Sequence, residues 1–191
     1  KLWTDKKDGE KVTIYEADSE LEEASYVVSQ VQRHIGTEAQ SFSDYAVLYR
    51  TNAQSRVMEE ALLHEGIPYV LVGGVRFYER KEIKDVLAYL RLILNPDDEV
   101  SRKRAEKNGK TRLGKLLEIG DSLTGKETLK ILDETLKATS YLDQYDPMNE
   151  EDAARLENIK ELRSVAAEHT ILTEFLEQVA LTEKEVQRRK G

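Results

Sequence analysis

The hydrophobic pattern of the chain changes near residue 98, and this change constrains the fold more than any other feature. Before it, short runs of β-branched, aromatic and apolar residues alternate with segments of helical spacing; the runs are residues 12–17, 46–49 and 69–72. After it, apolar residues recur at helical spacing only. Alternating strand and helix signals are typical of an α/β layer with a largely parallel sheet. We therefore predict an α/β unit over residues 1–98 and an all-helical unit over residues 99–191.

Caps and apolar stripes predict the individual helices. In the first half, Ser19 with Glu22 and Thr51 with Gln54 form capping-box patterns ahead of two helices. The stripe of a third helix consists of Ile83, Val86, Leu87, Leu90 and Ile93. Four more helices are expected over residues 113–123, 127–138, 150–168 and 172–188. The basic, weakly patterned residues 101–115 predict a loop between the two units.

One short segment points to a ligand. Tyr49 and Arg50 follow an apolar run and come directly before a predicted helix start. Ligands of parallel sheets bind beyond the carboxyl ends of the strands, so we expect both side chains at such an edge. A guanidinium can bind a phosphate in bidentate fashion, and a tyrosine ring can stack on a flat base. In the alternative interpretation, Arg50 pairs with a neighbouring carboxylate and Tyr49 is half buried.

A second segment, residues 73–85, mixes glycines, aromatic rings and basic side chains. Such a mixture can hold single-stranded nucleic acid, with Arg and Lys on phosphates and rings on bases. Arg76 and Lys81 are therefore candidate DNA-binding residues. In the alternative interpretation, Phe77 and Tyr78 pack the segment onto the core and its charges are solvated.

Composition argues against several classes of function. The chain has no cysteine, which excludes a disulfide framework or a thiolate metal site, and its three histidines are scattered. No metal site is predicted. No apolar run approaches the ~20 residues that a membrane span requires. The net charge of −8 argues against a generally basic surface but leaves room for a local basic groove.

No catalytic set is found in the sequence. The run NGKT at residues 108–111 lacks the earlier glycine of a phosphate-binding loop, because Arg104 occupies that position. A basic surface turn is the better interpretation. No serine, histidine and aspartate trio and no carboxylate pair stands out. By itself the chain does not have the sequence of a complete enzyme.

Two long stretches carry a specific resemblance. AVLYRTNAQSRVMEEALL and YVLVGGVRFYERKEIKDVLAYLRLILNPDDE resemble the superfamily 1A DNA helicases of the UvrD/PcrA family, and they are most similar to its PcrA branch. KETLKILDETLKATSYLDQY and ARLENIKEL resemble the helical 2B insertion of that family. The resemblance implies that residues 1–98 are part of a RecA-like domain 2A, with the motif IV region. Residues 99–191 would then be a shortened 2B-like subdomain.

The resemblance also implies an activity. The parent would be an ATP-dependent 3′–5′ DNA helicase of the bacterial cytoplasm that unwinds duplex DNA in repair or replication, with ATP and Mg²⁺ as cofactors. Its partners would be single-stranded and duplex-junction DNA, domains 1A and 1B of the same chain, and other repair or replication proteins, but no membrane. Tyr49 would stack on adenine, and Arg50 would contact the γ-phosphate as an arginine finger. The Walker A and B motifs and the metal ligands are expected outside these residues, so the chain alone is expected to be inactive.

Two other functions fit the sequence. The first is a non-catalytic interaction module that has a helicase-derived fold. The second is part of a helicase–nuclease subunit, which shares the motor and adds a nuclease domain. The run RTNAQSR fits the UvrD/PcrA branch better than the second alternative.

Overall fold

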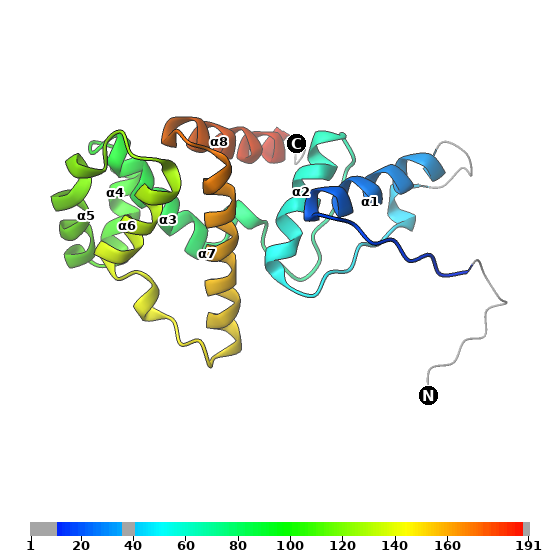
Figure 1. The fold of residues 1–191 in the computed structure, drawn as a ribbon, viewed down its shortest axis with the longest axis horizontal. Helices are drawn as coiled ribbons and strands as arrows, with labels where there is room; N and C mark the ends of the chain where they lie inside the picture. Colours follow the sequence, from blue (N-terminus) through cyan, green and yellow to red (C-terminus); the bar gives the residue numbers. More distant parts are fainter. Residues whose placement is uncertain (1–10, 36–40, 189–191) are drawn as a thin grey trace.

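The computed structural model describes residues 11–35 and 41–188, and every regular element within them is a helix (Figure 1). The α-helices are α1 (Glu20–Ile35), α2 (Ser55–His64), α3 (Lys81–Leu94), α4 (Glu99–Lys107), α5 (Lys110–Leu123), α6 (Thr128–Thr139), α7 (Glu150–Glu168) and α8 (Leu172–Arg188). Four 3-10 helices are η1 (Phe42–Asp44), η2 (Asn52–Gln54), η3 (Phe77–Glu79) and η4 (Leu142–Gln144). Figure 1 shows α1 and α2 at one end of an elongated molecule, α4 to α6 at the other, and the long helix α7 between them.

The parallel sheet predicted for the first half is wrong, because the described residues contain no β-strand. The expected strands are irregular segments with apolar side chains in solvent: Val12 is 92% exposed, Leu48 93% and Val72 88%. A strand forms only where a neighbouring strand completes its backbone hydrogen bonds, and the described chain supplies no such neighbour. β-propensity measures how well a side chain fits a pleated, half-buried surface, so it cannot replace the missing pairing.

Helix α3 lies at the centre of the larger hydrophobic core. Its predicted stripe is confirmed, with Ile83, Val86, Leu87 and Leu90 each at 0% exposure. Helices α4 to α8 supply most of the other side chains of this core, among them Leu132 of α6, Leu162 of α7 and Phe175 of α8. Full burial of one such side chain stabilises the fold by about 1.5–3 kcal/mol. The larger core therefore includes α3, which precedes residue 98. The division into two domains at residue 98 stays a prediction about the whole protein.

The helices predicted after residue 113 are confirmed, but the loop predicted before it is wrong. Residues 99–107 form α4, and α5 already begins at Lys110. The Asp98 Oδ1 atom caps α4 by accepting hydrogen bonds from Val100 N at 3.0 Å and Ser101 N at 3.1 Å. The buried face of α4 consists of Ser101 and Ala105. Such small residues give almost no hydrophobic periodicity, which explains why the pattern missed this helix.

Helices α1 and α2 form a second, smaller core, which we call the α1–α2 unit. Val28 and Val31 of α1 pack against Ile67, just beyond the end of α2. Gly66 makes this possible: it adopts a φ of +72°, which is unfavourable for residues with a Cβ. The turn lets Ile67 N donate to Leu62 O at 2.9 Å, so that the chain returns toward α1.

Candidate phosphate-binding site

Tyr49 and Arg50 lie in the turn that leads into η2 and α2. The side-chain oxygen of Gln54 accepts hydrogen bonds from the backbone N–H groups of both Arg50 and Thr51, each at 3.0 Å. One side chain thus fixes two consecutive peptide groups. The Arg50 side chain is exposed, and its guanidinium has no hydrogen bond or ion pair with any described residue. The neighbouring carboxylate of the alternative interpretation is therefore not seen in the described part of the chain.

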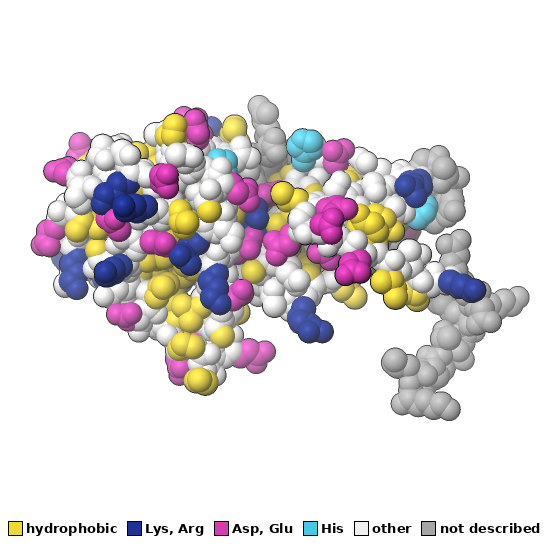
Figure 2. Space-filling view, in the orientation of Figure 1, with side chains coloured by type: hydrophobic (Ala, Val, Ile, Leu, Met, Phe, Trp, Pro, Cys, Tyr) yellow, Lys and Arg dark blue, Asp and Glu magenta, His cyan; other side chains and the backbone are white. Residues whose placement is uncertain are grey.

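A cleft of about 560 Å³ opens beside this turn. Asn52 of η2 lines it, together with the start of α3 and the first turns of α7. Its basic side chains are those of Arg80, Lys81, Lys84, Arg104 and Arg155, and its acidic ones those of Glu79, Glu82 and Glu151. Over the face seen in Figure 2, acidic and basic side chains are interspersed. The lining of the cleft therefore has two more basic than acidic side chains, in a chain with a net charge of −8.

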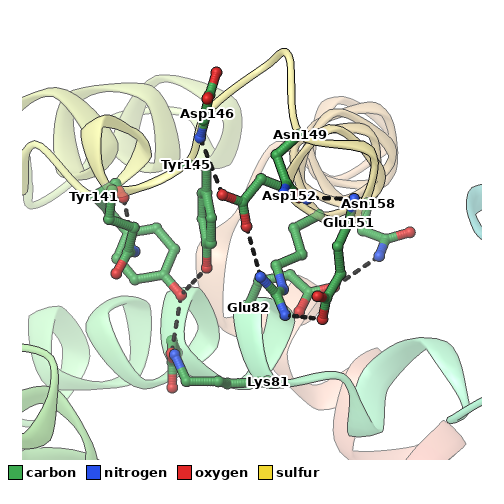
Figure 3. Close-up of polar contacts among 12 residues, drawn as sticks. Lys81, Glu82, Tyr141, Tyr145, Asp146, Asn149, Glu151, Asp152 and Asn158 are labelled. Atoms are coloured by element: carbon green, nitrogen blue, oxygen red, sulfur yellow. Dashed lines mark hydrogen bonds and ion pairs between the residues drawn. The ribbon is translucent and has the colours of Figure 1, made fainter.

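Lys81 lines this cleft and shares a buried carboxylate with a second cation. Its Nζ donates to Asp85 Oδ2 at 3.0 Å, while the Asp85 side chain is only 3% exposed. Arg104 Nε lies 2.9 Å from Asp85 Oδ1, an ion pair without hydrogen-bond geometry. The Tyr141 hydroxyl donates to the same carboxylate at 2.9 Å, next to Tyr145 (Figure 3). Burial raises the pKa of the Tyr141 hydroxyl above its ordinary value, which keeps the hydroxyl protonated as a donor to Asp85.

Arg80, which the sequence analysis did not select, connects α2 to the central helix α7. Its Nη2 donates to Ser55 Oγ at 2.9 Å, at the start of α2, and its Nη1 donates to Asn158 Oδ1 at 2.7 Å, in α7. Asn158 Nδ2 in turn donates to Glu82 Oε1 at 2.6 Å (Figure 3). Burial lowers the pKa of Arg80, and the charges of Glu59 and Glu82 oppose that shift. The network forms the inner wall of the cleft.

Arg76 faces a different and smaller cavity, of about 120 Å³, between α2, η3 and α8. Its Cζ lies 5.3 Å from the centre of the Tyr69 ring, and its Nη1 is buried without a hydrogen-bond partner among the described residues. The structure therefore does not bring Arg76 and Lys81 into one cleft. Phe77 and Tyr78 are 2% and 7% exposed. These two rings pack the segment onto the core, as the alternative interpretation expects.

Arg155, a further lining residue of the cleft, is held at the start of α7. Its Nη1 donates to Asp152 Oδ1 at 2.6 Å, and it also forms an ion pair with Glu151 (Figure 3). Its guanidinium lies over the Tyr145 ring, with Cζ 5.9 Å from the ring centre. Two acids therefore offset the charge of this arginine. Lys84 lines both this cleft and the smaller cavity.

Two further kinds of site were sought in the described residues. No group of three or more histidine, aspartate or glutamate side chains is placed to hold a metal ion. Across residues 11–35 and 41–188, no helix has the length and apolar character needed to cross a bilayer.

Comparison with known proteins places the chain in a family. The sequence profile of the UvrD-like helicase C-terminal domain matches residues 1–188. The ATP-dependent DNA helicase PcrA of Leuconostoc citreum is 48% identical over 114 residues, which are 60% of this chain and 15% of that protein. PcrA of Bacillus subtilis is 52% identical over 103 residues, 54% of this chain and 14% of the relative.

A third relative, PcrA of Staphylococcus aureus, is 48% identical over 103 residues. The matches with the first two relatives cover only 15% and 14% of their lengths. The profile match, in contrast, covers residues 1–188, which is nearly all of this chain. The chain therefore belongs to the family of UvrD-like helicase C-terminal domains.

Proposed function

We propose that this chain supplies part of the ATP site and part of the DNA-binding surface of a larger ATP-dependent 3′–5′ DNA helicase, which unwinds duplex DNA in the bacterial cytoplasm during repair or replication. The names of the relatives, ATP-dependent DNA helicases, support this proposal. One observation on the chain itself carries it. Arg50 is fixed at its backbone by Gln54, while its guanidinium is exposed and has no partner among the described residues.

In this proposal Arg50 binds a phosphate of ATP and Tyr49 stacks on the base. A guanidinium offers paired donors that match phosphate oxygens, and as an arginine finger it stabilises charge that develops during phosphoryl transfer. The Tyr49 side chain is 37% exposed, which leaves part of its ring open to a base. ATP with Mg²⁺ supplies the reactive phosphoryl group. The Walker residues and metal ligands belong to domains 1A and 1B, so the chain alone is inactive.

The same guanidinium chemistry fits a DNA phosphate, because the turn adjoins the basic cleft. Asn52, two residues after Arg50, lines the cleft that contains Lys81. We assign the cleft, with Lys81 on its wall, to the backbone of single-stranded or junction DNA. Arg76 faces the smaller cavity, so its proposed DNA contact has weaker support than that of Lys81.

The test is ATP hydrolysis by the full-length protein, measured against the concentrations of ATP and single-stranded DNA. Arg50→Ala is expected to lower turnover at saturating ATP and DNA by about 10³- to 10⁵-fold, the usual value of an arginine finger. Lys81→Ala should raise the DNA concentration for half-maximal stimulation but leave turnover at saturating DNA unchanged. Arg33→Ala is the matched control, because Arg33 is an exposed arginine of the α1–α2 unit; it should behave like the unchanged protein.

Other outcomes of the ATP hydrolysis assay would assign Arg50 or the whole chain a different role. If Arg50→Ala keeps its turnover but requires more DNA, then Arg50 binds a DNA phosphate and its role at ATP is wrong. If Arg50→Ala changes neither quantity, the proposed site fails and an interaction module becomes the better function. Degradation of the DNA in the same assay would favour the helicase–nuclease subunit.

A further inference from the structure

We propose that Gln54 is a positioning residue, which fixes the turn that presents the Arg50 guanidinium. This inference rests on the proposed phosphate-binding role of Arg50. The Gln54 Oε1 atom accepts from Arg50 N and from Thr51 N, both at 3.0 Å. Both peptide groups next to the Arg50 Cα are therefore tied to one acceptor. Their orientation determines the direction in which the Arg50 side chain leaves the backbone.

Gln54 is itself held firmly. It is the last residue of η2 and comes directly before α2. Its neighbours on either side, Ala53 and Ser55, are 8% and 1% exposed, and Ser55 Oγ accepts from the buried Arg80. Buried neighbours thus fix the backbone of Gln54, while its side chain and the turn that it holds lie at the surface. A small displacement of a reacting or binding group can cost on the order of 10²-fold in rate.

The same bonds contribute little to global stability, because they are solvent-exposed and water can replace an exposed acceptor. If Gln54 were only a structural cap, its loss would affect stability and turnover to a similar small extent. If Gln54 is a positioning residue, its loss lowers turnover much more than stability. Loss of the acceptor should disturb the chemistry that depends on Arg50 far more than it disturbs folding.

The experiment measures DNA-stimulated ATP hydrolysis by the full-length protein with Gln54→Ala, Gln54→Met and Gln54→Glu. Alanine and methionine remove the acceptor, methionine at nearly the original length, whereas glutamate keeps it, as in a capping box. Gln54→Ala and Gln54→Met should lower turnover at saturating ATP and DNA by about 10- to 10²-fold, and Gln54→Glu should restore most of it. The thermal midpoint should stay close to that of the unchanged protein.

Gln32→Ala is the matched control. Gln32 is an exposed glutamine whose Nε2 donates to Glu65 Oε2 at 3.0 Å, so its loss also removes one side-chain hydrogen bond. It should leave turnover unchanged. A double variant completes the design: in an Arg50→Ala background, Gln54→Ala should cause no additional loss, because both changes remove the same function.

Three results would overturn the inference. Normal turnover in Gln54→Ala and Gln54→Met, together with impaired Arg50→Ala, would show that the turn needs no support, although the proposed function would stand. An equal loss from Gln54→Ala with and without Arg50 would show that Gln54 acts independently of it. Normal turnover in Arg50→Ala, with an unchanged requirement for DNA, would reject the phosphate-binding role of Arg50 and this inference together.

Discussion

Asp85 is the most enclosed carboxylate of the cleft region, and it has Lys81, Arg104 and the Tyr141 hydroxyl around it. These three groups come from α3, α4 and the start of η4, so one carboxylate connects three parts of the larger core. A buried charge of this kind is tolerated because its partners are in place. Removal of the Asp85 charge leaves Lys81 and Arg104 close together without the carboxylate that neutralises part of their charge.

We predict that Asp85→Asn lowers the free energy of unfolding by about 2 kcal/mol, which is the scale of a hydrogen bond to a charged group. The measurement is urea unfolding of the chain. Asp97→Asn is the control, since Asp97 is exposed, and it should change the stability little. Equal stability of Asp85→Asn and the unchanged chain would show that the cluster does not hold the helices together.

The sequence alone predicted some of the basic residues that line the two cavities and missed others. Lys81 was selected because a basic residue in a segment rich in rings and glycines is a recognisable pattern. Arg80, its direct neighbour, was missed, because the Asn158 that orients it lies 78 positions away and leaves no local trace. Arg76 was selected on the same pattern as Lys81, yet it faces another cavity, since adjacent charges can lie on opposite sides of a turn.

At the scale of elements, apolar spacing predicted helices well and strands badly. The stripe of α3 is buried as expected, because a helix satisfies its own backbone hydrogen bonds and needs only an apolar face to pack. The runs at residues 12–17, 46–49 and 69–72 form no strands, because a strand depends on a neighbour that local spacing does not report. Helix α4 was missed for a third reason: its buried face is made of small residues.

Helix α2 carries a titratable group that links its packing to pH. Glu59 accepts hydrogen bonds from Ser55 Oγ at 2.8 Å and from the Tyr69 hydroxyl at 3.1 Å. Burial nevertheless raises the pKa of Glu59 above its ordinary value of 4.5. Below that value the carboxyl is protonated in both the folded and the unfolded chain. As the pH rises, the unfolded chain ionises first, so the contribution of Glu59 to stability falls.

We therefore predict that Glu59→Gln becomes more stable relative to the unchanged chain as the pH rises from about 4.5 to about 7. The measurement is urea unfolding at several pH values, with the difference in free energy as the readout. Glu177→Gln, at an exposed position of α8, is the control for the loss of one glutamate charge. A difference for Glu59→Gln that falls as the pH rises would contradict the burial of this carboxyl.

At the scale of the whole molecule, two hydrophobic cores meet across polar contacts. Arg56 of α2 donates from Nε to Glu161 Oε1 of α7 at 2.5 Å, and Arg80 connects Ser55 to Asn158. Charged hydrogen bonds are directional, so this interface sets the orientation of the α1–α2 unit against α7. The turn with Arg50 leads directly into α2, and the basic cleft lies along α7 and α3. The proposed ATP and DNA contacts are thus held in one polar framework.

The most direct test of this account is strand separation by the full-length protein on duplexes with a single-stranded tail at either the 3′ or the 5′ end. We predict ATP-dependent unwinding of the 3′-tailed duplex, little unwinding of the 5′-tailed duplex, and loss of unwinding in Arg50→Ala but not in Arg33→Ala. Unwinding of neither duplex, or full unwinding by Arg50→Ala, would contradict the claim that this chain supplies a phosphate contact to a 3′–5′ helicase.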